Sequence, residues 1–232
     1  MLRGRQGEQD ALLALHTEAG RGAGGGLVLL GEAGMGKSAL LAYAREQAIG
    51  FRIASVTGIE RESDLAYAGL HQLLRPWFNV ISCLPHAQAR ALRGALGLAD
   101  SEAPDRFLVS AALLELLCEA ASDAPLLVTV DDAQWLDGPT VDAIVFAARR
   151  LAAECVAVII AMRDEADEPP ELVLSTLHLE GLDAQATGAM LSDLAGRESP
   201  RREHDRVHRW AVEPLRVIHG HEQRRVRGDL SE

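Results

Sequence analysis

The residues with the clearest chemistry form a glycine-rich segment near the N-terminus. Gly31-Glu32-Ala33-Gly34-Met35-Gly36-Lys37-Ser38 fits the pattern G-x-x-x-x-G-K-[ST]. Glycines let such a segment wrap an anion with backbone N–H groups, and the N-terminus of a following helix favours negative charge. The ammonium reaches the β- and γ-phosphates of a nucleotide, and the hydroxyl ligates Mg²⁺. We therefore predict that these residues and the adjoining Ala39 bind ATP, with Lys37 also catalytic and Ser38 a magnesium ligand.

Lys37 is also unusual in composition, because it is the only lysine among the 23 Lys and Arg residues. All other positively charged side chains are arginines. A compact ammonium and a planar guanidinium are not interchangeable at a specific site. The position of the single lysine therefore supports a role at the phosphates.

A second set of chemically competent side chains follows the apolar run at residues 126–130, where Asp131 and Asp132 stand next to each other. Ligands of open α/β folds bind at the carboxyl ends of the strands. We expect Asp131 to hold Mg²⁺, directly or through water, and Asp132 to orient or activate the attacking water. An aspartate after a strand often only caps a helix, and this alternative stays open, most of all for Asp132.

Three further side chains complete the candidate site. Arg163 follows the apolar run 156–162 and could sense the γ-phosphate as a forked donor, or simply end a strand. Gln134 is a candidate to position water, and Trp135 is expected to pack under the loop. The predicted catalytic set is Lys37, Asp132 and Arg163.

Alternating strands and helices must place these residues. Apolar runs predict five strands, at residues 27–30, 51–56, 126–130, 156–162 and 175–179. Helical periodicity predicts helices at residues 6–19, 38–49, 65–77, 87–96, 105–121, 140–152 and 183–194. Pro76 should kink or end the third helix, and a turn at residues 137–139 should precede the sixth. Strands separated by helices predict an α/β fold with a parallel five-stranded sheet flanked by helices.

Charge divides the chain into a main domain and a short basic ending. Residues 1–196 carry 14 basic and 27 acidic side chains, whereas residues 197–232 carry nine arginines against seven acids. We predict a nucleotide-binding ATPase domain over residues 1–196. Residues 197–232 are expected to form an incomplete helical lid or a poorly ordered basic tail.

Composition also excludes several classes of protein. A formal net charge of -11 argues against binding to nucleic acid or anionic lipid through bulk electrostatics. No apolar run approaches the roughly 18 residues that cross a bilayer, so a cytoplasmic protein is expected. Cys83, Cys118 and Cys155 form no C-x-x-C pair, and we expect all three to be core residues.

Four segments together resemble the ATPase module of large ATP-binding LuxR-type transcriptional regulators. They are Gly4-Arg5, the glycine-rich segment 31–38, the run Ala-Gly-Leu-His-Gln-Leu-Leu-Arg-Pro at 68–76, and Val-Asp-Asp-Ala-Gln-Trp-Leu-Asp at 130–137. Such regulators belong to the STAND class of signal-transduction P-loop NTPases, which is related to AAA+ proteins. The resemblance covers about residues 2–196, and the segment around Trp135 is its most specific part.

The resemblance implies a switch in which ATP binding opens a self-associating state and hydrolysis resets it. It implies the following contacts for the matching residues: Gly4 and Arg5 near the adenine, Lys37 and Ser38 at phosphate and magnesium, Asp131 and Asp132 as the acidic pair, and Arg163 as the sensor arginine. Family members continue with a Gly-x-Pro lid motif, helical repeats and a helix-turn-helix. The segment at 212–215 keeps only Pro214 of that lid motif, so we expect altered lid closure. The sequence shows no helix-turn-helix pattern, so we expect no direct DNA binding.

The leading hypothesis is a regulatory switch domain that binds ATP with Mg²⁺ and hydrolyses it slowly. Its partners would be second copies of the chain, or sensor and effector domains in trans. One alternative is a P-loop phosphotransferase, with the arginine-rich segment 201–227 as its lid, whose turnover would require an added acceptor. Another is a non-catalytic remnant that binds nucleotide weakly or acts only as an interaction module. Such a remnant would hydrolyse no ATP, and replacing Asp131 or Asp132 by Ala would cause no loss of function.

Overall fold

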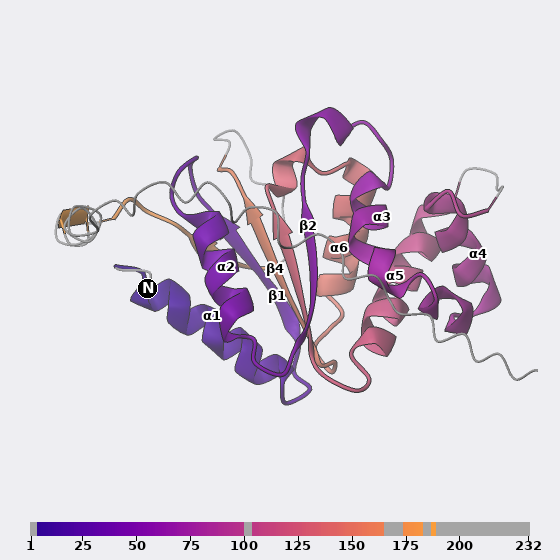
Figure 1. Ribbon diagram of the computed structural model, residues 1–232, viewed down its shortest axis with the longest axis horizontal. Coiled ribbons are helices and arrows are strands. Elements are labelled where there is room, and N and C mark those ends of the chain that lie inside the picture. Colours follow the sequence, from indigo (N-terminus) through magenta and orange to yellow (C-terminus); the bar gives the residue numbers. More distant parts are fainter. Residues whose placement is uncertain (1–3, 100–103, 165–173, 183–186, 189–232) are drawn as a thin grey trace, which may run out of the picture. The chain divides into compact units, whose positions relative to one another are not determined.

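Five strands form the centre of the fold in the order β2-β3-β4-β1-β5, and neighbouring strands all pair in parallel (Figure 1). They are β1 (Gly25–Leu30), β2 (Arg52–Thr57), β3 (Leu126–Asp131), β4 (Val156–Met162) and β5 (Ser175–His178). The structure is a computed structural model that describes residues 4–99, 104–164, 174–182 and 187–188. The predicted parallel five-stranded sheet is confirmed.

Helices cover both faces of this sheet. Those in the described ranges are α1 (Gln6–Ala19), α2 (Lys37–Gln47), α3 (Ala68–Leu74), α4 (His86–Ala95), α5 (Arg106–Ala120) and α6 (Gly138–Ala148). Short 3-10 turns lie at Glu60–Glu62, Arg75–Trp77, Val80–Cys83 and Ala133–Trp135. Figure 1 shows α1 and α2 on one face, and α3, α5 and α6 on the other, with α4 outside α5.

Strand residues alternate between two apolar cores, one on each face of the sheet. In β3, Val128 and Val130 belong to the core beneath α3, α5 and α6, whereas Leu127 belongs to the core beneath α1 and α2. In β1, Val28 and Leu29 divide in the same way. Successive strand side chains point to opposite faces, so a strand that is buried on both faces is apolar throughout. This is why continuous apolar runs located the central strands.

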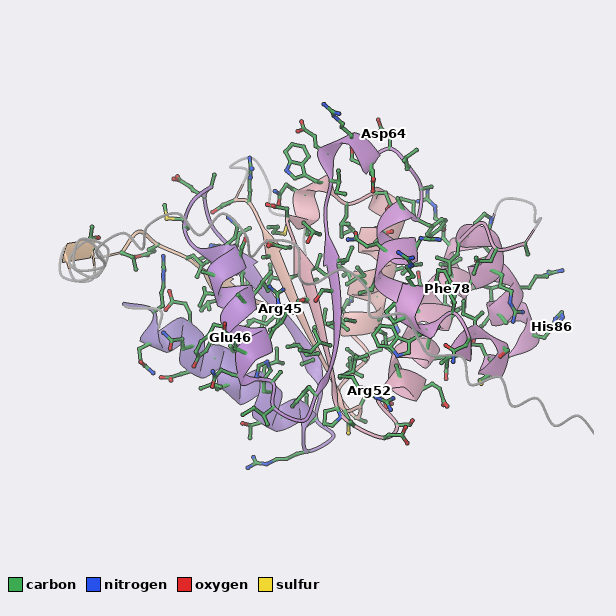
Figure 2. All side chains as sticks on the ribbon, in the orientation of Figure 1. Arg45, Glu46, Arg52, Asp64, Phe78 and His86 are labelled. Carbon is green, nitrogen blue, oxygen red and sulfur yellow. The ribbon has the colours of Figure 1, made fainter. Side chains whose placement is uncertain are left out.

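The edge strand β2 is covered on one face only. Ala54 and Val56 are buried against the helices, while the other residues of the strand are exposed. Arg52 at its start donates a 2.8 Å hydrogen bond to the Ala120 carbonyl and pairs with Asp123 at 2.9 Å. Figure 2 shows Arg52 at the lower end of this strand. These contacts attach the strand to the end of α5.

Two of the described helices begin two or three residues from the predicted position, whereas the others begin within one residue of it. α3 begins at Ala68 rather than at 65, because Tyr67 has a left-handed backbone (φ 64°) and donates its N–H to Asp137 Oδ1 at 2.7 Å. α6 begins at Gly138 rather than at 140, because Asp137 caps it and Pro139 fits its first turn. The expected turn at 137–139 is therefore the start of the helix.

Of the remaining predictions, one is confirmed, one is wrong for a single residue, and others concern residues outside the described ranges. Pro76 lies in the 3-10 turn that follows α3, so the predicted helix end is confirmed. Cys83 is exposed and the other two cysteines are partly buried, so the expectation of three core cysteines is wrong for Cys83. The predicted closing helix at 183–194 falls outside the described residues except at 187–188, and the predicted lid or tail at 197–232 lies wholly outside them. None of the helices in the described part of the chain is long and apolar enough to span a membrane.

Candidate nucleotide-binding site

The loop between β1 and α2 has the backbone of an anion site. Gly34 and Gly36 have φ of 83° and 88°, in the left-handed region that favours glycine. A Cβ at either position would meet no heavy atom within 4 Å, so the backbone angle, and not lack of space, calls for glycine. Successive backbone N–H groups in such turns form a concave anion site. α2 begins directly afterwards, and its N-terminus adds a favourable dipole for phosphate.

Lys37 is held inside this loop. Its side chain is only 7% exposed, and Nζ donates hydrogen bonds to the carbonyl oxygens of Gly31 at 2.6 Å and Glu32 at 2.8 Å. An ammonium has three donors, so these bonds leave one N–H for a phosphate oxygen. The loop therefore both fixes the lysine and leaves it able to bind an anion.

The other predicted catalytic side chains gather around this ammonium. Burial lowers the pKa of Lys37, and the charge of Asp132 is the largest influence in the opposite direction. Arg163 adds to the lowering of this pKa, and Asp131 opposes it. The phosphate loop follows β1, the two acids lie at the end of β3, and Arg163 follows β4; these three parallel strands are neighbours in the sheet. The structure thus brings Lys37, Asp131, Asp132 and Arg163 to one edge of the sheet, although they lie on three segments of the chain.

The two aspartates differ in how they are held. Asp131 ends β3, and its Oδ1 accepts the N–H of Asp132 at 3.0 Å. Asp132 has a left-handed backbone, with φ 47° and ψ 48°, and begins the 3-10 turn that contains Trp135. The Trp135 N–H donates to the Asp132 carbonyl at 2.9 Å. Asp132 therefore starts a turn with its backbone, and its carboxylate is not the cap of that turn.

Ser38 and Asp131 are the residues that would hold magnesium. Ser38 is exposed in the first turn of α2, and Asp131 is partly buried at the end of β3. Both supply oxygen atoms, which are the ligands Mg²⁺ prefers, and water and phosphate complete such a shell. Among the described residues no group of three or more His, Cys, Asp and Glu could hold a metal ion by itself. The donor set fits magnesium carried with a nucleotide, where the ion would neutralise charge on the phosphates.

Gln134 lies between Asp132 and the end of β4. Its Nε2 donates to Asp132 Oδ1 at 2.9 Å, and its Oε1 accepts the backbone N–H of Arg163 at 3.1 Å. The Arg163 guanidinium carbon lies 5.8 Å from the centre of the Trp135 ring, within cation–π range. The sequence indicates polar and aromatic side chains here, but not these partners.

Arg5 lies beside the phosphate loop, and protein groups use its guanidinium. The residue is 7% exposed. Its Nη2 donates to the carbonyls of Met35 at 3.0 Å and Glu180 at 2.7 Å, and its Nη1 pairs with Glu8 at 2.7 Å. Arg5 therefore joins the start of α1, the phosphate loop and the segment after β5. A direct contact of Arg5 with the nucleotide stays a prediction.

Gly58 belongs to no motif, yet the site depends on it. A Cβ at Gly58 would overlap the Asp132 carbonyl oxygen and lie 3.0 Å from the Leu136 nitrogen. Its N–H donates to the Asp131 carbonyl at 2.9 Å. A single glycine after a strand is only a weak signal of close backbone approach. Its importance becomes visible once β2 is placed beside β3.

Comparison with known proteins identifies the family. Residues 1–160 match the AAA ATPase domain family. The crystal structure of Cdc6p from Pyrobaculum aerophilum is similar, with a TM-score of 0.55 at 17% identity, over 84% of this chain and 50% of that chain. The Walker-type ATPase PABY2304 of Pyrococcus abyssi has a TM-score of 0.46 at 16% identity, over 84% of this chain and 59% of that one. Comparison with curated proteins finds no significant match.

These findings agree with the geometry of the site. The family match covers the phosphate loop, both acidic residues and most of β4. The similarity to Cdc6p supports the same fold, and this chain spans 50% of the length of that protein's chain. The chain belongs to the AAA ATPase domain family, and its described part is a P-loop nucleotide-binding domain of that type.

Proposed function

We propose that this chain is an ATP-binding regulatory switch domain of the LuxR-type STAND class that hydrolyses ATP slowly. The observation that carries the proposal is the arrangement around Lys37, where a buried ammonium bonded to the phosphate loop feels the charges of Asp132 and Arg163. One ligand that requires all of these groups is a nucleoside triphosphate with Mg²⁺. Ser38 and Asp131 would hold the ion.

Slow hydrolysis follows from the acid that would act on water. An aspartate side chain is one methylene shorter than glutamate, so Asp132 reaches less far towards a water beside the γ-phosphate. Geometry limits general base catalysis before basicity does. We therefore expect turnover well below that of vigorous ATPases.

A switching role is supported by the links between the loop and the rest of the domain. Arg5 connects the Met35 carbonyl in the phosphate loop to the Glu180 carbonyl after β5. A movement of one of these segments when phosphate binds would therefore act on the other. We propose that second copies of the chain, or sensor and effector domains in trans, respond to this change, and that the protein acts in the cytoplasm.

The proposal is tested by comparing the protein with bound ATP and with bound ADP. Backbone hydrogen exchange would be measured in Mg²⁺ with each nucleotide, and phosphate release would be followed in the same sample. We expect slow release without any added acceptor. We also expect slower exchange with ATP than with ADP in two places, the turn at 132–136 and the segment at 179–182, because the γ-phosphate contacts the first and Arg5 couples the second.

Two results would contradict the switch. One is an identical exchange pattern with ATP and ADP, which would leave a nucleotide-binding domain that does not change with the nucleotide. The other is phosphate transfer only when a small-molecule acceptor is added, which would indicate a phosphotransferase. Helix α4 serves as the internal reference, since it lies outside the site and its exchange should not depend on the nucleotide.

A further inference from the structure

The turn after β3 fixes the backbone of Asp132 but not its carboxylate. The left-handed conformation at φ 47° and the bond from the Trp135 N–H to the Asp132 carbonyl hold the main chain. The close approach of Gly58 leaves this main chain no room to shift towards β2. The torsions of an aspartate side chain stay free under these constraints. Another group must set the direction of the carboxylate.

Gln134 is that group, and its amide has one orientation that satisfies both neighbours. Nε2 faces the Asp132 carboxylate at 2.9 Å, and Oε1 faces the Arg163 N–H at 3.1 Å. A carboxylate only accepts hydrogen bonds, and a backbone N–H only donates them. With the amide reversed, oxygen would face oxygen and N–H would face N–H. These two partners therefore fix the orientation of the Gln134 amide, and the amide fixes the direction of the Asp132 carboxylate.

The end of β4 connects these hydrogen bonds of Gln134 to Lys37. The Arg163 N–H donates to Gln134, and the next N–H, that of Asp164, donates to the Gly31 carbonyl at 3.3 Å. The same Gly31 oxygen accepts the Lys37 ammonium at 2.6 Å. Two consecutive N–H groups are thus linked to Asp132 through Gln134 and to Lys37 through the Gly31 carbonyl.

We propose that Gln134 is the positioning residue of Asp132 for ATP hydrolysis. It acts through Asp132, by fixing the direction of this carboxylate relative to Lys37, and it makes this direction depend on the end of β4. The inference rests on the proposed function, because it concerns turnover at the same site. It goes beyond that function by separating the residue that sets turnover from those that bind the nucleotide.

The variant Gln134→Glu tests the proposal with almost no change of shape. The introduced carboxylate can still accept the Arg163 N–H, but it cannot donate to Asp132. We expect the turnover number to fall roughly tenfold or more, because small misplacements of a catalytic group are costly. We expect the dissociation constant of MgATP to change less than about threefold, because the group acts mainly on the transition state. Gln134→Met, which keeps the length and donates nothing, should give the same split.

Each outcome decides the proposal. It is supported if turnover falls in Gln134→Glu and Gln134→Met while MgATP binding persists, and if Gln72→Glu, the same change on the exposed side of α3, turns over ATP like wild type. It is overturned if turnover is unchanged or rises, or if binding weakens as much as turnover. A wild-type chain that binds ATP without hydrolysing it also overturns the proposal, and it leaves nucleotide binding intact. Failure of ATP binding in the wild type would instead overturn the proposed function.

Discussion

Two buried basic side chains, Lys37 and His16, meet their surroundings in opposite ways. The Lys37 ammonium has two carbonyl acceptors, and the charges of Asp132 and Asp131 oppose the lowering of its pKa by burial. His16 is 6% exposed, and neither of its ring nitrogens has a hydrogen-bond partner among the described residues. Its ring lies 5.5 Å from that of Phe51, measured between centroids. Burial alone therefore lowers the pKa of His16.

The lowered pKa of His16 predicts how the free energy of unfolding depends on pH. The folded state holds His16 neutral to a lower pH than the unfolded chain does, so below about pH 6.5 the unfolded chain binds more protons. The free energy of unfolding should fall as the pH is lowered from 7.5 to 5.5, a range chosen to bracket this value, with a contribution from His16 of at most about 1.4 kcal/mol per pH unit. Urea unfolding at several pH values measures it. In His16→Phe this contribution should disappear, whereas His86→Phe at an exposed position should keep it (Figure 2). Equal slopes in wild type and His16→Phe would contradict the assignment.

The chemistry of single residues was predictable where the backbone pattern itself demands a residue type. The glycines before Lys37 and the acids after β3 are of this kind, and the structure brings them together. The partners of Gln134 and Arg5 were not predictable. Gln134 bonds to a residue 29 positions away, and Arg5 bonds to one 175 positions away. Such contacts depend on which strands lie side by side, and no local pattern encodes this.

At the scale of elements, one carboxylate joins two helices. Asp137 is 2% exposed. Its Oδ1 accepts the N–H groups of Tyr67 at 2.7 Å and Thr140 at 2.9 Å, and its Oδ2 accepts that of Gly69 at 3.1 Å. Thr140 Oγ1 in turn accepts the Leu70 N–H at 3.0 Å. The start of α3 and the start of α6 are therefore satisfied by the same short segment.

Loss of this shared cap should lower the free energy of unfolding more than loss of a cap that serves a single helix. Asp137→Asn keeps the shape but removes the charge and one acceptor atom, so it should lower the free energy of unfolding by about 2–4 kcal/mol. Asp105→Asn is the matched control, because Asp105 caps only α5 and is exposed. Asparagine is a good cap, so its cost should stay below about 1 kcal/mol. Urea unfolding of both variants measures the difference, and equal losses would show that Asp137 serves α6 alone.

The contacts of Asp137 also explain why two helix starts could not be predicted from the sequence, whereas the strands could. Strand positions follow from burial on both faces, and each of the five predicted strands has a counterpart within about two residues. The start of α3 was missed because it depends on the bond from Tyr67 to Asp137, which lies 70 positions away. The start of α6 was missed because Gly138 and Pro139 also occur in turns. Capping by Asp137 decides between a turn and a helix.

At the scale of the whole molecule, the described residues of the candidate site all lie within the first of two compact units. This unit comprises Met1–Ser192, and every described contact of the phosphate loop, the acids and Arg163 lies inside it. The family match over residues 1–160 covers the phosphate loop and both acids, and it ends three residues before Arg163. The domain boundary at residue 196 stays a prediction from charge. The fold class could be predicted because helices separate the strands β1 to β4 along the described part of this unit.

The central claim is that MgATP binds at Lys37, and a titration tests it most directly. ATP would be titrated calorimetrically into the wild type with and without Mg²⁺, and into Lys37→Ala and Arg149→Ala, the latter removing a positive charge at an exposed position. We expect saturable binding to the wild type and to Arg149→Ala, tighter with Mg²⁺, and no measurable binding to folded Lys37→Ala, because the buried ammonium is the main cation for the phosphates. Binding of equal affinity to the wild type and Lys37→Ala would contradict the claim.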